Sequence, residues 1–232
     1  KGPLMNTELF TGKAEVYEKA RPGYPDGAID YIATLVPPDA VLADIGAGTG
    51  KFALRLAERG YTVLAVEPNA DMRTQLARTL APYANARVIT GSAEATTLPD
   101  GCVDAIVCAQ ALHWFDPVAF RAECRRIGKS SGLVIAVYNN TPGGTSPARS
   151  QLATEVFFSN PVVREFPNPM DYTREIWLAY MSSHSHSPLP SDPGYTEHLV
   201  EMNTLFDRES IDGLLRRDVV TRVYSERIRI DA

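Results

Sequence analysis

The stretch Val41-Leu42-Ala43-Asp44-Ile45-Gly46-Ala47-Gly48-Thr49-Gly50 decides the fold of this chain. Its first five residues are mostly apolar, as a parallel strand covered on both faces should be. The apolar spacing of Lys51 to Arg59 then predicts a helix, with Gly60 at its C-terminal end. Three glycines therefore lie where a strand meets a helix. Residues without Cβ allow a sharp turn there and let a ligand lie directly against the backbone amides.

The neighbours of this glycine turn indicate which ligand it holds. Dinucleotide folds bind a pyrophosphate with the spacing Gly-x-Gly-x-x-Gly, but here the third glycine comes one residue early and Lys51 takes its place. Asp44 would repel a pyrophosphate and attract an ammonium group. The next predicted strand, Thr62 to Val66, is followed by Glu67, whose carboxylate can accept both hydroxyls of a ribose. The two acids predict a nucleoside cofactor with an amino-acid moiety.

Strands and helices alternate through the first 140 residues. Apolar runs predict strands at Val41–Ile45, Thr62–Val66, Arg87–Gly91, Val103–Ala109 and Leu133–Tyr138. Helices are predicted at Glu8–Ala20, Asp26–Leu35, Lys51–Arg59, Pro68–Leu80 and Pro117–Ile127. This rhythm is typical of a doubly wound α/β fold with a right-handed parallel sheet.

The rhythm stops after the fifth strand. Residues 148 to about 203 are expected to form a helical cap, with a loop rich in Ser, His and Pro at Ser182–Pro193. Thr204–Asp207 and Val219–Arg229 are expected to form an antiparallel hairpin, with a helical connection near Glu209–Leu215. These would be the last two strands of the sheet.

Several of these motifs carry a family resemblance. Asp44–Gly50, Val66-Glu67-Pro68-Asn69 and Leu98–Ala105 resemble the motifs of class I S-adenosylmethionine-dependent methyltransferases. More narrowly, Tyr17–Pro25 and Gln110–Asp116 are similar to the methyltransferase type 11 group that includes trans-aconitate methyltransferase-like proteins.

The resemblance implies a mostly parallel, seven-stranded Rossmann-like sheet in the order 3-2-1-4-5-7-6. It divides the chain into an N-terminal lid segment (1–36), a cofactor-binding core (37–140), a helical cap or insertion after strand five (141–203) and the C-terminal strands (204–232). The implied activity is methyl transfer from S-adenosyl-L-methionine to a small-molecule acceptor, directed at oxygen, nitrogen or a carboxyl group, with S-adenosyl-L-homocysteine as product.

The expected cofactor-binding residues come from the lead segment and from successive strand ends. They are Tyr17, Arg21, Asp44, Gly46, Gly48, Gly50, Glu67, Pro68, Met72, Ser92, Ala93, Glu94 and Gln110. Several have a structural alternative: Arg21 pairs with the cofactor carboxylate or is solvated, Glu67 binds the ribose or caps the next helix, and Met72 packs on adenine or in the core. Ser92 stands where many relatives of the resembling family carry Asp, which leaves the adenine-binding side chain open.

The acceptor side is expected to involve His113, Trp114 and His184. His113 is the candidate catalytic residue, because a neutral imidazole can take a proton from the acceptor; alternatively it only holds its loop by hydrogen bonds. Trp114 either shields the sulfonium or packs under the cap. His184 either lines the acceptor pocket or is a loop histidine, and no metal site is expected around it.

Composition narrows the class of protein. The 232 residues carry a formal charge of −5 with no basic block, so no nucleic-acid footprint is expected. The three cysteines lack Cys-x-x-Cys spacing, and no apolar run reaches the length of a membrane span. We therefore expect a cytoplasmic monomer or homodimer without a membrane partner. Two alternatives stay open: a non-catalytic protein that binds S-adenosylmethionine, and a nicotinamide-dependent oxidoreductase.

Overall fold

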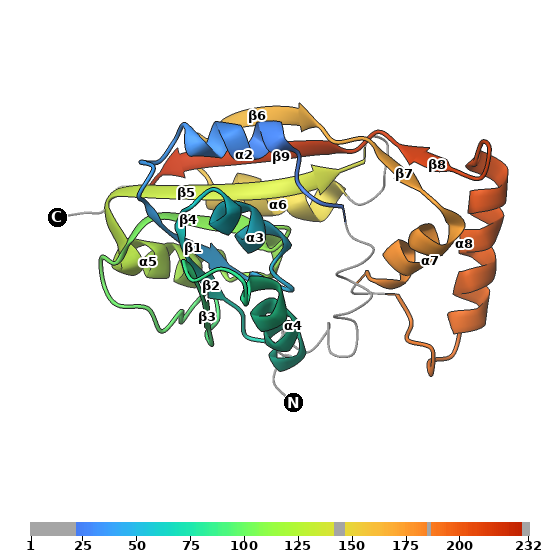
Figure 1. Cartoon of the computed structure of the whole chain (residues 1–232), viewed down its shortest axis with the longest axis horizontal. Coiled ribbons are helices and arrows are strands. Elements are labelled where there is room, and N and C mark those ends of the chain that lie inside the picture. The colour runs from blue at the N-terminus through green and yellow to red at the C-terminus, as the bar shows by residue number, and fades with distance from the viewer. Residues whose placement is uncertain (1–21, 142–146, 185–186, 229–232) are drawn as a thin grey trace.

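The computed structural model describes residues 22–141, 147–184 and 187–228. Two sheets organise this part of the chain: a seven-stranded sheet in the order β3-β2-β1-β4-β5-β9-β6 and a two-stranded sheet, β7-β8 (Figure 1). The predicted Glu8–Ala20 helix, Tyr17 and Arg21 lie outside the described residues.

Five parallel strands form the first part of the large sheet. They are β1 (Val41–Ile45), β2 (Thr62–Val66), β3 (Ala86–Ile89), β4 (Val103–Ala109) and β5 (Gly128–Asn140). The runs of Val, Ile, Leu and Ala in β1, β4 and β5 are almost fully buried, because helices cover both faces of the sheet. The predicted α/β class and the order of these five strands are confirmed.

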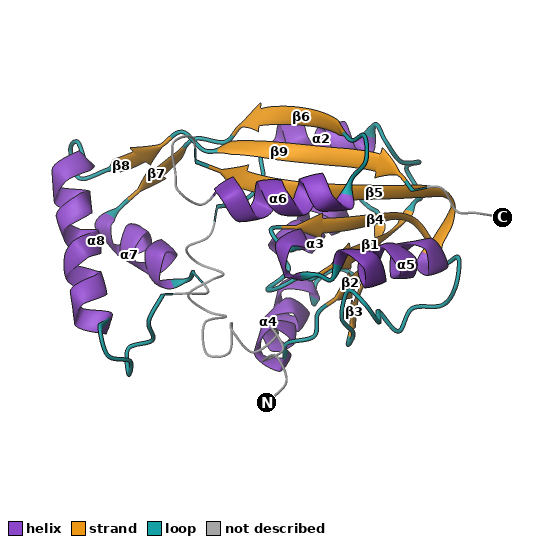
Figure 2. Cartoon of the chain, turned by 180° about the vertical axis from the view of Figure 1, so that it is seen from behind, coloured by secondary structure: helices purple, strands orange, loops and turns teal. Residues whose placement is uncertain are grey.

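The covering helices divide between the two faces. α2 (Asp26–Ala33), α3 (Lys51–Glu58) and α4 (Ala70–Leu80) contribute to one hydrophobic core, whereas α5 (Pro117–Ile127) and α6 (Pro147–Phe157) contribute to the other. In Figure 2, which views the molecule from behind, α5 and α6 lie in front of the strands. No described helix has the length and apolar character needed to cross a membrane.

The last two strands of the large sheet are β9 (Val220–Arg227) and β6 (Val162–Pro167). β9 pairs antiparallel with β5, and β6 pairs antiparallel with the other edge of β9. The predicted Val219–Arg229 strand is thus confirmed within the described residues, and the sheet has the expected 3-2-1-4-5-7-6 order when β6 and β9 are counted as strands six and seven.

The source of strand six differs from the prediction. Thr204–Asp207 is not a strand but part of α8 (Tyr195–Glu209), where Leu199, Met202 and Phe206 continue a helical spacing. Strand six comes instead from Val162–Pro167, inside the segment 141–203 that was expected to be helical. The predicted helical connection at Glu209–Leu215 is also wrong, because α8 ends at Glu209 and β8 begins at Leu215.

The insertion therefore follows strand six, not strand five. It consists of β7 (Met170–Tyr172), α7 (Arg174–Ser182), α8 and β8 (Leu215–Arg217). It has a small core of its own, formed by Tyr172, Trp177, Phe206 and Leu215. Figure 1 shows it as a lobe beyond one end of the large sheet.

Candidate active site

The glycine turn after β1 adopts backbone angles that favour glycine. Gly46, Gly48 and Gly50 have φ values of +70°, +58° and +94°. A Cβ at Gly46 would lie 2.9 Å from Cβ of Ala111, and one at Gly50 would lie 2.7 Å from Cδ1 of Leu76. A Cβ at Gly48 would meet nothing within 4 Å. Gly46 and Gly50 thus permit close packing, whereas Gly48 faces space that a ligand can fill.

Glu67 holds the turn from the end of β2. Its Oε2 accepts the backbone N–H of Gly48 at 2.8 Å, and its Oε1 accepts the N–H of Asn69 at 2.9 Å. The side chain is buried, and this burial raises the pKa of the carboxyl above its usual value despite the two backbone donors. Each carboxylate oxygen can accept a further hydrogen bond. The geometry leaves capacity for two hydroxyl donors.

Asp44 and Thr49 are polar residues buried at the glycine turn. Neither carboxylate oxygen of Asp44, nor Oγ1 of Thr49, makes a hydrogen bond of ordinary geometry among the described residues. Burial, followed by the charge of Glu67, raises the pKa of Asp44 to about 8, and the amide of Ala53 opposes this only in part. Unsatisfied buried groups are rare in proteins, and a cationic ligand would satisfy Asp44.

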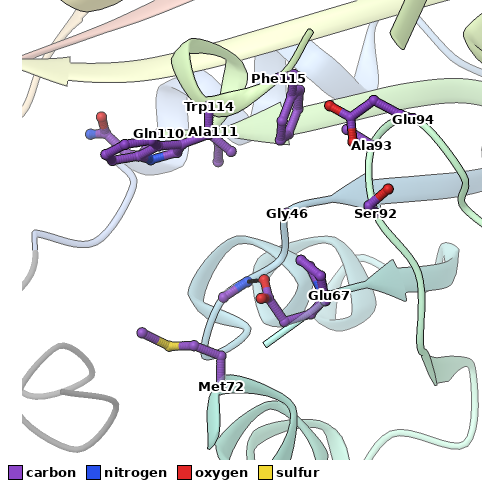
Figure 3. A pocket seen from close by; sticks show the side chains of 13 residues that line it. Gly46, Glu67, Met72, Ser92, Ala93, Glu94, Gln110, Ala111, Trp114 and Phe115 are labelled. Carbon is purple, nitrogen blue, oxygen red and sulfur yellow. Dashed lines mark hydrogen bonds between the residues drawn. The ribbon is translucent and has the colours of Figure 1, made fainter. Parts of the chain in front are cut away.

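Two cavities meet at this turn. The first spans about 730 Å³, part of which is open to solvent, and is lined by Gly46, Gly48, Glu67, Pro68, Met72, Ser92, Ala93, Glu94, Ala109, Gln110, Ala111, Trp114 and Phe115 (Figure 3). The second encloses about 440 Å³ and is lined by Pro22, Tyr24, Asp44, Gly46, Ala47, Gly48, Thr49, Lys51, Phe52, Ala109 and Gln110. They share Gly46, Gly48, Ala109 and Gln110, so one elongated ligand can occupy both.

The first cavity has two walls. Figure 3 shows Glu67 and Met72 on one side and Trp114 and Phe115 on the other. The turn after β3 closes one end: Ser92 and Ala95 exchange backbone hydrogen bonds of 3.1 and 3.3 Å. Oε1 of Glu94 accepts the N–H of Asp116 at 3.0 Å, which ties this turn to the start of α5. The cavity is therefore shaped by the ends of four neighbouring strands.

The loop after β4 completes the site. Gln110 has a φ of +56°, which is uncommon for a residue with a side chain. Its N–H donates to the carbonyl of Val137 at 2.8 Å, and its Nε2 donates to the carbonyl of Asn139 at 3.4 Å. These bonds to β5 hold Gln110 where the two cavities join.

His113 lies apart from both cavities. Its backbone N–H and its Nδ1 each lie 3.1 Å from the hydroxyl of buried Tyr138, and its ring lies 4.7 Å from that of Trp114. His184, two residues beyond the end of α7, has Nδ1 3.1 Å from the carbonyl of Met181 and also lines neither cavity. Among the three expected acceptor-side residues, the structure brings only Trp114 to the first cavity.

The structure gathers the expected cofactor residues with few exceptions. Asp44 lines the second cavity, and Gly50 lines neither because it packs against α4. Sequence reasoning missed Ala109, Ala111 and Phe115 in the first cavity and Pro22, Tyr24, Ala47, Thr49, Lys51 and Phe52 in the second. Their positions in or beside the motifs at 17–25, 44–50 and 110–116 were the only signal. In the described residues no group of three or more His, Cys, Asp or Glu is placed to hold a metal ion.

Comparison with known proteins agrees with this geometry. Residues 43–136 match the family model described as a methyltransferase domain. Over these residues the chain is similar to a methyltransferase domain. It is 40% identical over 135 residues to an uncharacterised methyltransferase of Mycobacterium tuberculosis, a match that covers 56% of this chain and 51% of that protein. The chain thus spans about half the length of the curated relatives it matches.

Two solved methyltransferase structures share the fold. A putative type II methyltransferase from Anaeromyxobacter dehalogenans aligns over 91% of this chain and 99% of its own, with a TM-score of 0.67 and 23% identity. Geranyl diphosphate C-methyltransferase from Streptomyces coelicolor, solved with Mg²⁺, geranyl diphosphate and S-adenosyl-L-homocysteine, aligns over 88% and 79%, with a TM-score of 0.50 and 16% identity. At sequence identities this low, the similarity to these structures shows a shared fold alone. The narrower similarity to trans-aconitate methyltransferase-like proteins stays an expectation.

Proposed function

We propose that this protein binds S-adenosyl-L-methionine across the two cavities and transfers its methyl group to a small-molecule acceptor. The observation that carries the proposal is the pairing of Glu67 in one cavity with the unsatisfied Asp44 in the other. A ligand that suits both has hydroxyl donors at one end and a cation at the other. The family match supports the same cofactor.

The binding roles follow from position. Glu67 accepts the ribose hydroxyls, and the amide of Ala93 with the polar groups of Ser92 and Glu94 contacts the base edge. Met72 packs on the adenine. In the second cavity Asp44 pairs with the ammonium group, at a cost in desolvation that the ligand's charge offsets. Pro68 and Gly46 line the first cavity between these ends.

S-adenosyl-L-methionine supplies a methyl group on a positively charged sulfur, which an electron-rich atom of the acceptor displaces in line. The protein's contribution is to hold donor and acceptor in that geometry and exclude water, an effect on the order of 7 kcal/mol or more when alignment is good. Gln110, which lines both cavities, and Trp114, which lines the first, are placed to limit water there. A base is needed only if the acceptor must lose a proton.

Of the two roles considered for His113, we propose that it positions its loop rather than acts as a base. Its contact with Tyr138 fixes the loop that carries Trp114, and it lines a different groove from the cofactor cavities. The further expectations of a cytoplasmic monomer or homodimer, without a nucleic-acid or membrane partner, rest on the sequence.

Calorimetry with S-adenosyl-L-homocysteine and NADH tests the cofactor assignment. We expect micromolar or tighter binding of the former and none of the latter. Incubation with S-adenosyl-L-methionine and a panel of carboxylic acids, phenols, amines and thiols then tests turnover, with S-adenosyl-L-homocysteine measured by mass spectrometry. Binding without turnover of any acceptor would favour a non-catalytic binding protein, and binding of NADH alone would favour an oxidoreductase.

A further inference from the structure

A second groove lies on the other side of the loop after β4. It runs between η2 (Leu112–Trp114), the start of α5 and one face of α6, and spans about 540 Å³, part of which is open to solvent. We call it the α6 groove; the residues that matter here are His113, Phe115, Pro117, Arg149, Leu152 and Val156. It shares only Phe115 with the first cavity, so it is distinct from the cofactor site.

The outer side of the α6 groove is apolar and exposed. Leu152 and Val156, one turn apart on α6, are 60% and 57% exposed to solvent. Other valines such as Val118 and Val200 are exposed as well, but among these exposed side chains it is Leu152 and Val156 that line the groove. Side chains of this kind along a groove favour an apolar ligand segment that lies lengthwise on the helix.

One end of the α6 groove carries a positive charge. The Arg149 guanidinium lies 5.5 Å from the centroid of the Trp114 ring, and none of the ion pairs found among the described residues includes Arg149. Arg149 precedes Leu152 by three residues, so the cation and the apolar side chains lie on one side of α6. An arginine beside an aromatic ring can bind a carboxylate and keep its ring contact.

We propose that the α6 groove binds an amphipathic organic anion, with its carboxylate at Arg149 and its apolar chain along Leu152 and Val156. The cation at one end and the exposed apolar side chains along the helix point to this class of ligand. The proposal goes beyond the methyl-transfer function and does not depend on it. Trp114 then lies between the two sites, because it lines the cofactor cavity and its ring contacts Arg149 of the anion site.

The fluorescence of Trp114 also provides a way to measure binding in the α6 groove. The chain has two tryptophans, so Trp177→Phe leaves Trp114 as the single indole reporter. We expect decanoate, titrated below its micellar concentration, to change Trp114 emission in a saturable way, and calorimetry on the unmodified protein to give the same dissociation constant. Decanol, which lacks the charge, should bind at least fivefold more weakly, and so should butyrate, which lacks the chain.

Substitutions locate the site. Arg149→Gln and Leu152→Asn should each weaken decanoate binding at least fivefold, and both residues are exposed, so the fold should be retained by circular dichroism. Arg125→Gln is the matched control, because Arg125 is exposed on α5 and does not line the groove. Absence of saturable binding would overturn the proposal. Binding that neither Arg149→Gln nor Leu152→Asn weakens would overturn it equally, since it would place decanoate elsewhere.

Discussion

The backbone N–H of Gly48 donates to Oε2 of Glu67 at 2.8 Å, so the glycine turn is fastened to the tip of the next strand. The same carboxylate accepts the N–H of Asn69, the residue that caps α4 through its own side chain. Glu67 therefore holds together the glycine turn and the start of α4, beside the position proposed for the ribose. Its role in ligand binding and its role in the local fold are linked, and variants must separate them.

Glu67→Ala should weaken binding of S-adenosyl-L-homocysteine by about 1 to 3 kcal/mol, because hydrogen bonds to a charged acceptor are lost. Glu67→Asp should recover little, since the shorter side chain cannot reach both hydroxyls and the Gly48 amide. Calorimetry measures the affinities, and Arg78→Gln, an exposed change on α4, is the control. Parent-like affinity of Glu67→Ala would mean that Glu67 acts only as a local cap.

Cofactor affinity should rise with pH between about 6 and 8. In the ligand-free protein burial and the charge of Glu67 keep the pKa of Asp44 near 8, so the carboxyl is protonated below that pH. The ligand's ammonium favours the carboxylate and lowers this pKa in the complex, so binding releases a proton. The affinity for S-adenosyl-L-homocysteine should thus increase by up to about tenfold per pH unit. A similar slope in Asp44→Asn would assign the proton to another group.

Asp44 should also cost the ligand-free protein stability. A folded-state pKa raised above the unfolded value gives stability that is present at low pH and is lost as the pH rises toward 8. Asp44→Asn removes this loss, so it should raise the free energy of unfolding by about 2 kcal/mol or more at pH 8 and by much less at pH 4. Urea titrations at both pH values measure the difference. An equal effect at the two pH values would show that ionisation of Asp44 is not the cause.

Gly46→Ala and Gly48→Ala should have different consequences. At Gly46 a Cβ would crowd Ala111 as well as strain a positive φ, so we expect a loss of about 2 to 4 kcal/mol of stability. At Gly48 the Cβ meets open space, so stability should fall by only about 1 kcal/mol, while the methyl group obstructs the bound ligand. Denaturation and calorimetry on both variants separate packing from binding. Equal affinity of Gly48→Ala and the parent would contradict contact of the ligand with Gly48.

The parts of the fold that the sequence predicts are those with a strong local pattern. β1 and β4 are buried apolar runs, and the glycines at 46–50 mark the strand-to-helix turn between β1 and α3. β6 has no such pattern, because Val162 to Glu165 are all exposed at the edge of the sheet. Thr204–Asp207 reads equally well as strand or helix until the small core around Phe206 decides for a helix.

The residues of the candidate site also fall into those that the sequence predicts and those that it does not. Asp44 and Glu67 are predictable because strand ends in a parallel sheet meet at one edge. Phe115 and Ala111 reach the cavity only because the loop after β4 folds back onto Gly46, a long-range contact with no sequence signature. The α6 groove depends on packing between η2 and α6, which the sequence does not predict for the same reason.

His113→Asn tests whether the imidazole moves a proton. The structure places Nδ1 beside the hydroxyl of Tyr138, and burial raises the pKa of that phenol well above its usual value, so the phenol stays neutral and can hold the ring by a hydrogen bond. We therefore expect His113→Ala to disturb the loop, with cofactor affinity and transfer rate falling together, and His113→Asn to restore most of both. An amide can keep one hydrogen bond but cannot accept the proton.

A general base would give a different result. Both variants would then lower the transfer rate by about 10² or more at unchanged cofactor affinity, and the parent rate would rise through the imidazole pH range. The measurement is single-turnover methyl transfer to whichever acceptor the panel identifies, together with calorimetry on each variant. A His113→Asn protein that binds the cofactor normally yet transfers no methyl group would establish the base, because only the lost proton acceptor distinguishes it from the parent.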